Sequence, residues 1–132
     1  MWLFTTFGFF SVITPKENAG RGPKIEKNKV MIRARLRSHL EALQDRYPLL
    51  AKSRILQSPA PADYHWRLIA DRVVWGNVVR DLVVSSEITN FKSAAALEAK
   101  TPADHRYVHA LHQVWAIMDG LQREAEAENQ HP

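Results

Sequence analysis

Hydrophobic and polar residues alternate strictly along 30–37, and this period of two predicts a β-strand. One side of the strand would face a core and the other would face water. The core side comprises Val30, Ile32, Ala34 and Leu36, and the other side comprises Met31, Arg33, Arg35 and Arg37. We expect this strand to be the central element of the fold.

Other segments have the composition of strands. Residues 2–5 and 9–13 are dense in aromatic and β-branched side chains, and the intervening 6–8 suits a tight turn or a bulge because Gly8 accepts a positive φ at little cost. We expect 9–13 to pair antiparallel with the strand over 30–36. Residues 63–70 alternate again, with Tyr64, Trp66 and Leu68 on one side and His65, Arg67 and Ile69 on the other.

Two helices are predicted in the middle of the chain. Ser38 and Glu41 have the spacing of a capping box and begin a helix that ends before Pro48. Asp71 can cap the second helix, although Gly76 and the many valines there also fit a strand. The apolar face of this second helix would be formed by Val74, Trp75, Val78, Val79 and Leu82.

The C-terminal part of the chain also has a helical pattern. Asn90 suits a cap ahead of an alanine-rich short helix over 93–100, and Thr101 with Pro102 opens the last helix. Residues 124–132 are acidic, and we expect them to form a frayed tail. The last helix has an apolar stripe that we expect to be buried: Tyr107, Leu111, Val114, Trp115, Met118 and Leu121.

These elements predict a single domain over 1–132 of the α+β class. We expect a two-layer fold, with a three- to four-stranded antiparallel sheet and about four helices packed on one face. Residues 14–29 combine prolines and glycines with lysines and an arginine, and we expect a mobile basic loop that joins two strands.

Composition is that of a soluble globular protein, with 45% hydrophobic and 24% charged residues. Cysteine is absent, which excludes disulfides, thiolate chemistry and cysteine-based zinc sites. The apolar stretch 1–13 lacks a basic flank and a cleavage site, and no run approaches the roughly 18 apolar residues of a membrane span. We expect a cytoplasmic protein that does not associate with membranes.

Charge is divided unevenly along the chain. Residues 1–60 carry 11 Lys and Arg against 4 Asp and Glu, whereas 61–132 carry 7 against 10. A basic half attracts anionic partners, such as nucleic acid or an acidic protein surface. The same charge also suits a solvated surface that only favours solubility.

The arginine row is the first candidate for a binding site. Arg33, Arg35 and Arg37 would lie about 6.6 Å apart on one strand face, and such a row can follow a phosphate backbone. The alternative is a solvated face on which arginines pair with Glu41 and Asp63. Supporting candidates are Lys24, Lys27 and Lys29 in the loop and Arg67, with His65, in the later strand; secondary candidates are Tyr64, Asn90 and Lys92.

Neither a metal site nor a catalytic site is indicated. His105 and His109 have the i, i+4 spacing of metal ligands, with Asp104 near, but His112 would lie about 10 Å from His105 along the helix axis. The chain has no glycine-rich phosphate loop, nucleophile elbow or metalloprotease motif. We expect no cofactor and no metal, and a non-enzymatic protein; an enzyme whose site is assembled only in space is an alternative.

Five blocks of residues resemble, in order, the signature of a family of small uncharacterised bacterial proteins. The blocks are Gly8-Phe9-Phe10-Ser11-Val12, Val30 to Leu36, Asp63-Tyr64 with Arg67, Asn90-Phe91-Lys92 and Leu111-His112-Gln113-Val114-Trp115. The resemblance covers Trp2 to about Leu121. It implies a single independent fold and a bacterial or mobile-element source, and it indicates no activity. Glu87-Ile88-Thr89 and the long basic loop depart from the pattern.

We therefore expect a small binding protein whose basic sheet face and loop contact nucleic acid or a nucleic-acid-handling complex. One alternative is an inhibitor or adaptor of the kind that mobile elements encode, anti-CRISPR proteins included, which would dock on an acidic protein surface. Another is a small enzyme with an unrecognised site. Phosphate contacts make affinity fall steeply with salt, so a salt series separates the first hypothesis from the others.

Overall fold

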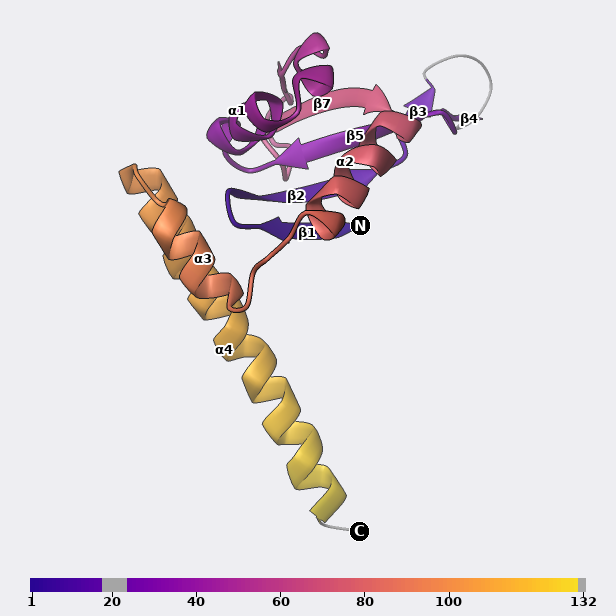
Figure 1. Cartoon of the computed structure of the whole chain (residues 1–132). Helices are drawn as coiled ribbons and strands as arrows, with labels where there is room; N and C mark the ends of the chain where they lie inside the picture. Colours follow the sequence, from indigo (N-terminus) through magenta and orange to yellow (C-terminus); the bar gives the residue numbers. More distant parts are fainter. Residues whose placement is uncertain (18–23, 131–132) are drawn as a thin grey trace. The chain divides into compact units, whose positions relative to one another are not determined.

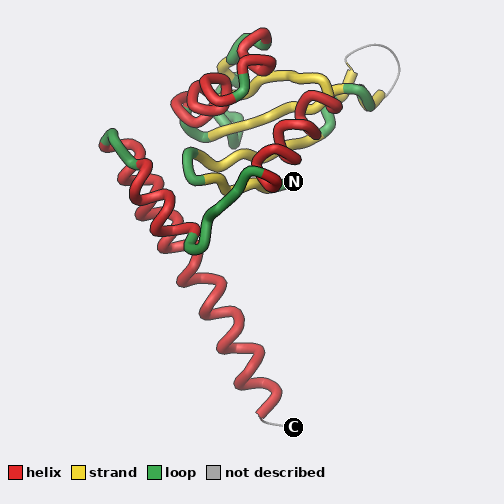
Figure 2. Tube along the Cα trace, in the orientation of Figure 1, coloured by secondary structure: helices red, strands yellow, loops and turns green. Residues whose placement is uncertain are grey.

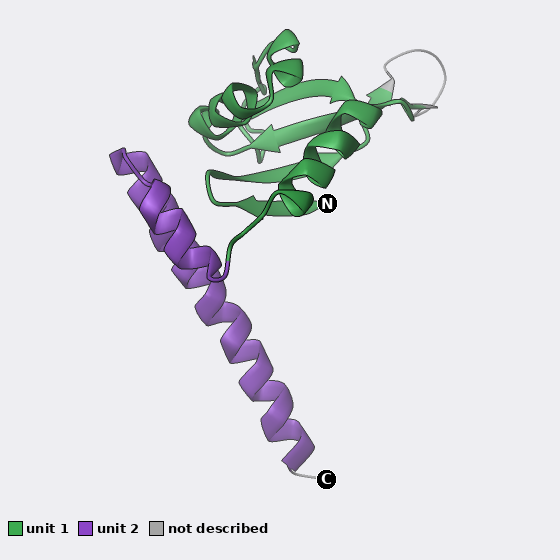
Figure 3. Ribbon diagram, in the orientation of Figure 1, with its two compact units in different colours: residues 1–88 green, residues 89–132 purple. Residues whose placement is uncertain are grey.

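A computed structural model describes residues 1–17 and 24–130 of the chain. The chain forms two compact units, Met1–Ile88 and Thr89–Pro132, which Figure 3 colours separately.

The first unit contains a five-stranded antiparallel sheet in the order β1-β2-β5-β7-β6 (Figure 1). The strands are β1 (Trp2–Thr5), β2 (Gly8–Ile13), β5 (Lys29–Ala34), β6 (Leu56–Gln57) and β7 (Trp66–Asp71). A separate two-stranded pair is formed by β3 (Lys16–Glu17) and β4 (Lys24–Ile25) within the segment that the sequence suggested as a loop. The antiparallel α+β fold is confirmed, with five strands where three or four were expected.

The central position of β5 is confirmed. Val12 on β2 lies opposite Ile32 on β5, and Ile32 lies opposite Leu68 on β7. These three side chains are buried on the same face of the sheet. The expected antiparallel pairing of β2 with β5 is therefore observed.

Two helices cover this buried face: α1 (Arg37–Arg46), which is followed by the short 3-10 helix η1 (Pro48–Lys52), and α2 (Arg72–Val84) (Figure 2). The valine-rich segment after Asp71 is thus helical. The largest contributors to the core are Phe10, Ile32, Leu40, Leu43, Leu50, Leu68 and Trp75. Burial of these apolar side chains is the main term that stabilises the unit.

The starts of α1 and α2 differ from the expected caps. Helix α1 begins at Arg37 without a side-chain cap, so Ser38 lies within its first turn and Glu41 pairs with Arg37 at 3.1 Å. Asp71 is the N-cap residue of α2, but its carboxylate binds the Lys29 ammonium instead of a helix amide. In both helices a side chain that was expected to cap, Glu41 in α1 and Asp71 in α2, forms an ion pair instead.

The tight turn between β1 and β2 is confirmed, but the reason for Gly8 is different from the expected one. Its φ lies outside the positive region. A Cβ at Gly8 would lie 2.7 Å from the Cγ of His39 on α1, well inside contact distance. The Nδ1 atom of the same histidine accepts a hydrogen bond from the Phe9 amide at 3.2 Å. Close packing of α1 on the turn therefore requires glycine.

The second unit contains α3 (Phe91–Glu98) and α4 (Pro102–Gln130), which pack against each other. The predicted caps are confirmed: the Oδ1 of Asn90 accepts from the Ser93 amide, and the hydroxyl of Thr101 accepts from the Asp104 amide. The acidic segment expected to fray continues α4 as far as Gln130.

Burial of the α4 stripe was expected along its whole length, and this expectation is wrong. Tyr107 and Leu111 are buried, whereas Trp115, Met118 and Leu121 are each more than half exposed. The reason is length: α3 has 8 residues and α4 has 29, so α3 can cover only about 12 Å of a helix about 43 Å long. Within residues 1–17 and 24–130, no helix combines the length and the hydropathy needed to cross a membrane.

Candidate nucleic-acid interface

The sheet face opposite α1 and α2 carries arginine and aromatic side chains. Strand register places Phe4 opposite Phe9 and Arg33 opposite both Ser11 and Arg67, with all of these side chains on the face away from the buried one. We name this surface the arginine–aromatic face and define it as Trp2, Phe4, Phe9, Arg33, Arg35, Tyr64 and Arg67.

Tyr64 lies at the centre of the arginine–aromatic face. The guanidinium carbons of Arg33 and Arg35 lie 4.6 and 4.4 Å from its ring centroid, and the residue is only 6% exposed. Cation–π contacts of this kind contribute about 0.5–2 kcal/mol each. The sequence pattern grouped Tyr64 with Trp66, but β7 begins only at Trp66, so the chain before it turns the tyrosine to the other side.

Arg33 is held in place by β2. Its Nη2 donates to the Ser11 hydroxyl at 2.6 Å, and its Nε donates to the Ser11 carbonyl at 3.5 Å. Ser11 is 1% exposed and is therefore well covered. These bonds and the Tyr64 ring fix the guanidinium plane, which reduces the entropic cost of binding an anion.

Arg35 is tied to a neighbouring loop more loosely. Its Nη1 donates to the Asp63 carbonyl at 3.0 Å and to the Asp63 carboxylate at 3.3 Å. Both side chains are more than half exposed, so this ion pair contributes little to stability. The pairing anticipated for Asp63 is thus present, and it is weak enough for another anion to replace it.

Arg67 joins the site as the sequence suggested. It lies directly opposite Arg33 in the sheet, and like charges in that position repel each other. Within residues 1–17 and 24–130, Arg67 has no ion-pair partner. An anion bound between the two guanidinium groups would remove this repulsion.

The expectation that Arg37 extends the row is wrong. Strand β5 ends at Ala34, and Arg37 is the first residue of α1. Its guanidinium lies over the ring of Trp66, 5.3 Å from the centroid, on the side of the sheet that faces the helices. The row therefore consists of Arg33 and Arg35, with Arg67 beside them.

The three candidate lysines lie towards the other end of β5. Lys29 is about 13 Å from Arg33 along the strand, and its bond to the Asp71 carboxylate at 2.5 Å raises the pKa of the ammonium above its ordinary value. The carbonyl of Lys27 accepts a hydrogen bond from Arg72. Lys24 lies on β4, and its side chain is outside the described part of the structure. Lys27 and Lys29 therefore do not join the arginine cluster.

An aromatic run continues the site to the edge strand, and sequence reasoning missed it. Phe4 stacks on Phe9 with centroids 4.4 Å apart, Trp2 meets Phe9 edge-on at 5.7 Å, and Phe9 lies 6.4 Å from Tyr64. Trp2 is 71% exposed. The sequence did contain a signal for these residues. A two-residue turn between β1 and β2 fixes which residues of the two strands lie opposite each other, and this pairing places the aromatics on the side of Arg33.

Asn90 and Lys92 belong to the second unit, and helix structure there accounts for them. Asn90 caps α3, and the Lys92 ammonium lies 4.4 Å from the ring centroid of Trp115 on α4. Three histidines of α4 are exposed: His105, His109 and His112. Among the described residues, no group of three or more His, Asp or Glu side chains could hold a metal ion.

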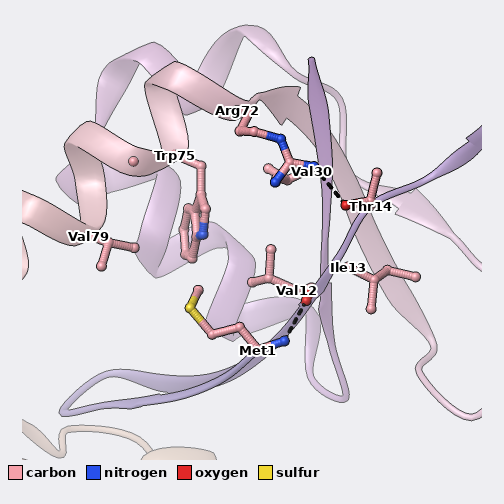
Figure 4. A pocket seen from close by; sticks show the side chains of 9 residues that line it. Met1, Val12, Ile13, Thr14, Val30, Arg72, Trp75 and Val79 are labelled. Carbon is pink, nitrogen blue, oxygen red and sulfur yellow. Dashed lines mark hydrogen bonds between the residues drawn. The ribbon is translucent and has the colours of Figure 1, made fainter. Parts of the chain in front are cut away.

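A hollow of about 440 Å³ lies on the helix side of the sheet (Figure 4). Arg72 at its rim donates to the Thr14 hydroxyl and to the carbonyls of Lys27 and Lys29, which anchors the start of α2. The buried indole nitrogen of Trp75 has no hydrogen-bond partner among the described residues. The hollow is lined by Met1, Val12, Ile13, Thr14, Val30, Arg72, Trp75, Gly76 and Val79. The guanidinium of Arg72 is thus occupied by contacts within the first unit.

The arginine–aromatic face combines flat rings with fixed positive charge. Rings can stack on nucleobases, and guanidinium groups can bind phosphates or carboxylates through paired hydrogen bonds. The family resemblance noted in the sequence stays a prediction. No family model matches the chain, and searches of curated proteins and of solved structures likewise give no match.

Proposed function

We propose that the protein binds single-stranded nucleic acid through its arginine–aromatic face. The observation that carries this proposal is the stacking of Arg33 and Arg35 on Tyr64, next to the exposed rings of Trp2 and Phe4. Base stacking on such rings contributes about 1–3 kcal/mol per base and tolerates many sequences.

Single strands fit this face better than duplexes do. A sheet surface with rings at the outer strand and charges at the centre can take unstacked bases and the adjoining phosphates together. The bases of a duplex are stacked on one another and are not free for such contacts. The first unit carries 14 Lys and Arg against 8 Asp and Glu, which favours the approach of a polyanion.

The arginine test uses fluorescence anisotropy with a labelled pyrimidine single strand over a salt series. We predict that Arg33→Gln with Arg35→Gln weakens binding at least tenfold, about 1.4 kcal/mol, and lowers the salt slope by about one unit for each phosphate that is no longer bound. The matched control is Arg54→Gln with Arg80→Gln, which removes two exposed arginines elsewhere in the same unit. Full affinity in a folded Arg33, Arg35 variant contradicts the proposal.

A second measurement separates stacking from charge. Trp2→Leu with Phe4→Leu keeps the charge and the apolar character of the outer strand but removes the rings. Affinity for the single strand should fall while the salt slope stays the same, because the arginines still bind the same phosphates. Unchanged affinity would confine the site to the arginines.

An acidic protein surface is the second candidate partner. Arg35 already binds the carboxylate of Asp63, and a carboxylate from an inhibitor target could take that place. This partner requires no base stacking. Failure to bind any single strand at low salt, together with an arginine-dependent interaction with an acidic protein, would favour this alternative.

A further inference from the structure

The outer half of α4 presents an apolar surface that the second unit leaves exposed. Its members are Val114, Trp115, Ile117, Met118 and Leu121, and we name them the outer α4 stripe. Each is more than a third exposed, and Ile117 is 71% exposed. Monomeric proteins rarely expose contiguous apolar patches of more than a few hundred Å².

The spacing of these residues is that of a helix that pairs with another helix. Val114, Met118, Leu121 and Ala125 follow one another at intervals of four, three and four residues, beyond the part of α4 that α3 covers. Such a repeat keeps one seam directed at a partner helix along its length. Trp115 and Ile117 widen the seam on its two sides.

We propose that the outer α4 stripe binds the same stripe of a second copy of this chain, with the two α4 helices antiparallel. An exposed fraction above a third leaves roughly 100 Å² on each side chain, or about 500 Å² per copy and about 1,000 Å² in a pair. Stable interfaces bury about 1,200–2,000 Å², so the apolar residues supply most of the area and their neighbours the rest.

The distribution of charge selects the antiparallel direction. The outer end of α4 carries Glu124, Glu126 and Glu128, whereas nearer the middle of α4 the Lys92 ammonium lies 4.4 Å from the ring centroid of Trp115. Parallel helices would place the acidic ends side by side, which is repulsive. Antiparallel helices centred near Leu121 place each acidic end beside Lys92 and Trp115 of the other copy, and the helix dipoles also favour this direction.

The oligomeric state of the full chain tests the pair. We expect sedimentation equilibrium to show a dimer, and Ile117→Glu with Leu121→Glu to raise its dissociation constant at least about 100-fold, because each charge is buried twice in a symmetric interface. The control is Gln113→Glu with Ala116→Glu, which adds the same charges on exposed positions outside the stripe. A monomeric native chain, a larger assembly, or a folded stripe variant that stays dimeric overturns the proposal.

Cross-linking tests the direction without charged variants. The chain has no cysteine, so Leu121→Cys and Gln130→Cys each introduce a single thiol. In an antiparallel pair centred near Leu121, beyond the part of α4 that α3 covers, the two thiols at 121 lie close together, whereas those at 130 lie about 27 Å apart at 1.5 Å per residue. A short bismaleimide should join the first variant and not the second. Joining through position 130, or failure to join through 121, refutes the arrangement.

Discussion

Gly8 is constrained by its neighbour across space and not by its own backbone angle. A Cβ there would meet the Cβ and Cγ of His39, which cannot swing away because His39 is itself buried on α1. We predict that Gly8→Ala lowers the free energy of unfolding by about 1–3 kcal/mol, the usual cost of overpacking.

Gly76 is the matched control for this substitution. It lies within α2, and a Cβ there would meet nothing within 4 Å. Gly76→Ala should raise the free energy of unfolding by about 0.5–1 kcal/mol, since alanine favours helix. Urea unfolding of the two variants checks both signs; a decrease at both positions would show that the close approach of His39 is not the cause.

At the scale of elements, Tyr47 joins the end of α1 to α2. Its hydroxyl donates to the Asp81 carboxylate at 2.8 Å, and burial, followed by this hydrogen bond, raises the pKa of Tyr47 to about 12. The ordinary value is 10.0. The folded state therefore keeps a phenolic proton at pH values where the unfolded state loses it.

This difference predicts how stability changes in alkaline solution. The contribution of Tyr47 should be fully present below about pH 10 and should be lost progressively as the pH rises towards about 12. Tyr47→Phe has no proton to lose, so the alkaline decrease in its melting temperature should be smaller than in the native chain. Melting curves of both proteins over this range measure the difference, and equal decreases would contradict the prediction.

Periodicity predicted the interiors of elements well and their ends poorly. The alternation over 30–34 identified β5 and its buried face, because a period of two assigns every side chain to one side. It failed at Arg37 and Tyr64, which lie outside the strands. The residue at which a strand ends depends on the side chains that pack against that part of the chain. Local alternation carries no information on this packing. Strands of two residues, such as β6, are too short to show a period.

At the scale of the whole molecule, the basic character of the chain belongs to one unit. The first unit has six more basic than acidic residues, whereas the second has two fewer basic than acidic residues. The candidate anion site therefore lies in the unit whose net charge attracts anions. The charge counts for 1–60 and 61–132 indicated this division correctly, although the unit boundary follows Ile88. The reason is that residues 61–88, which lie between the two boundaries, carry little net charge.

Which surfaces are covered could not be predicted from the sequence. The apolar pattern of α4 is the same at Leu111, which α3 buries, and at Met118, which remains exposed. Only the length of the partner helix distinguishes the two positions.

Three arginines and Tyr64 of the candidate site were predicted from the sequence. The aromatics of β1 were not predicted, because the face on which they lie depends on the exact length of a turn.

The sheet order also has a consequence for the sequence of folding events. Strands β1 and β2 are joined by a two-residue turn, and such hairpins form in about 1–10 μs. The β5–β7 pair joins residues as distant in sequence as Lys29 and Asp71, so a long loop that contains α1 must close first. Trp2, Phe4 and Phe9 should therefore meet before Tyr64 reaches Arg33. Pulse-labelled hydrogen exchange should detect amide protection in β1 and β2 ahead of β7, and the aromatic part of the binding face would exist before its charged part.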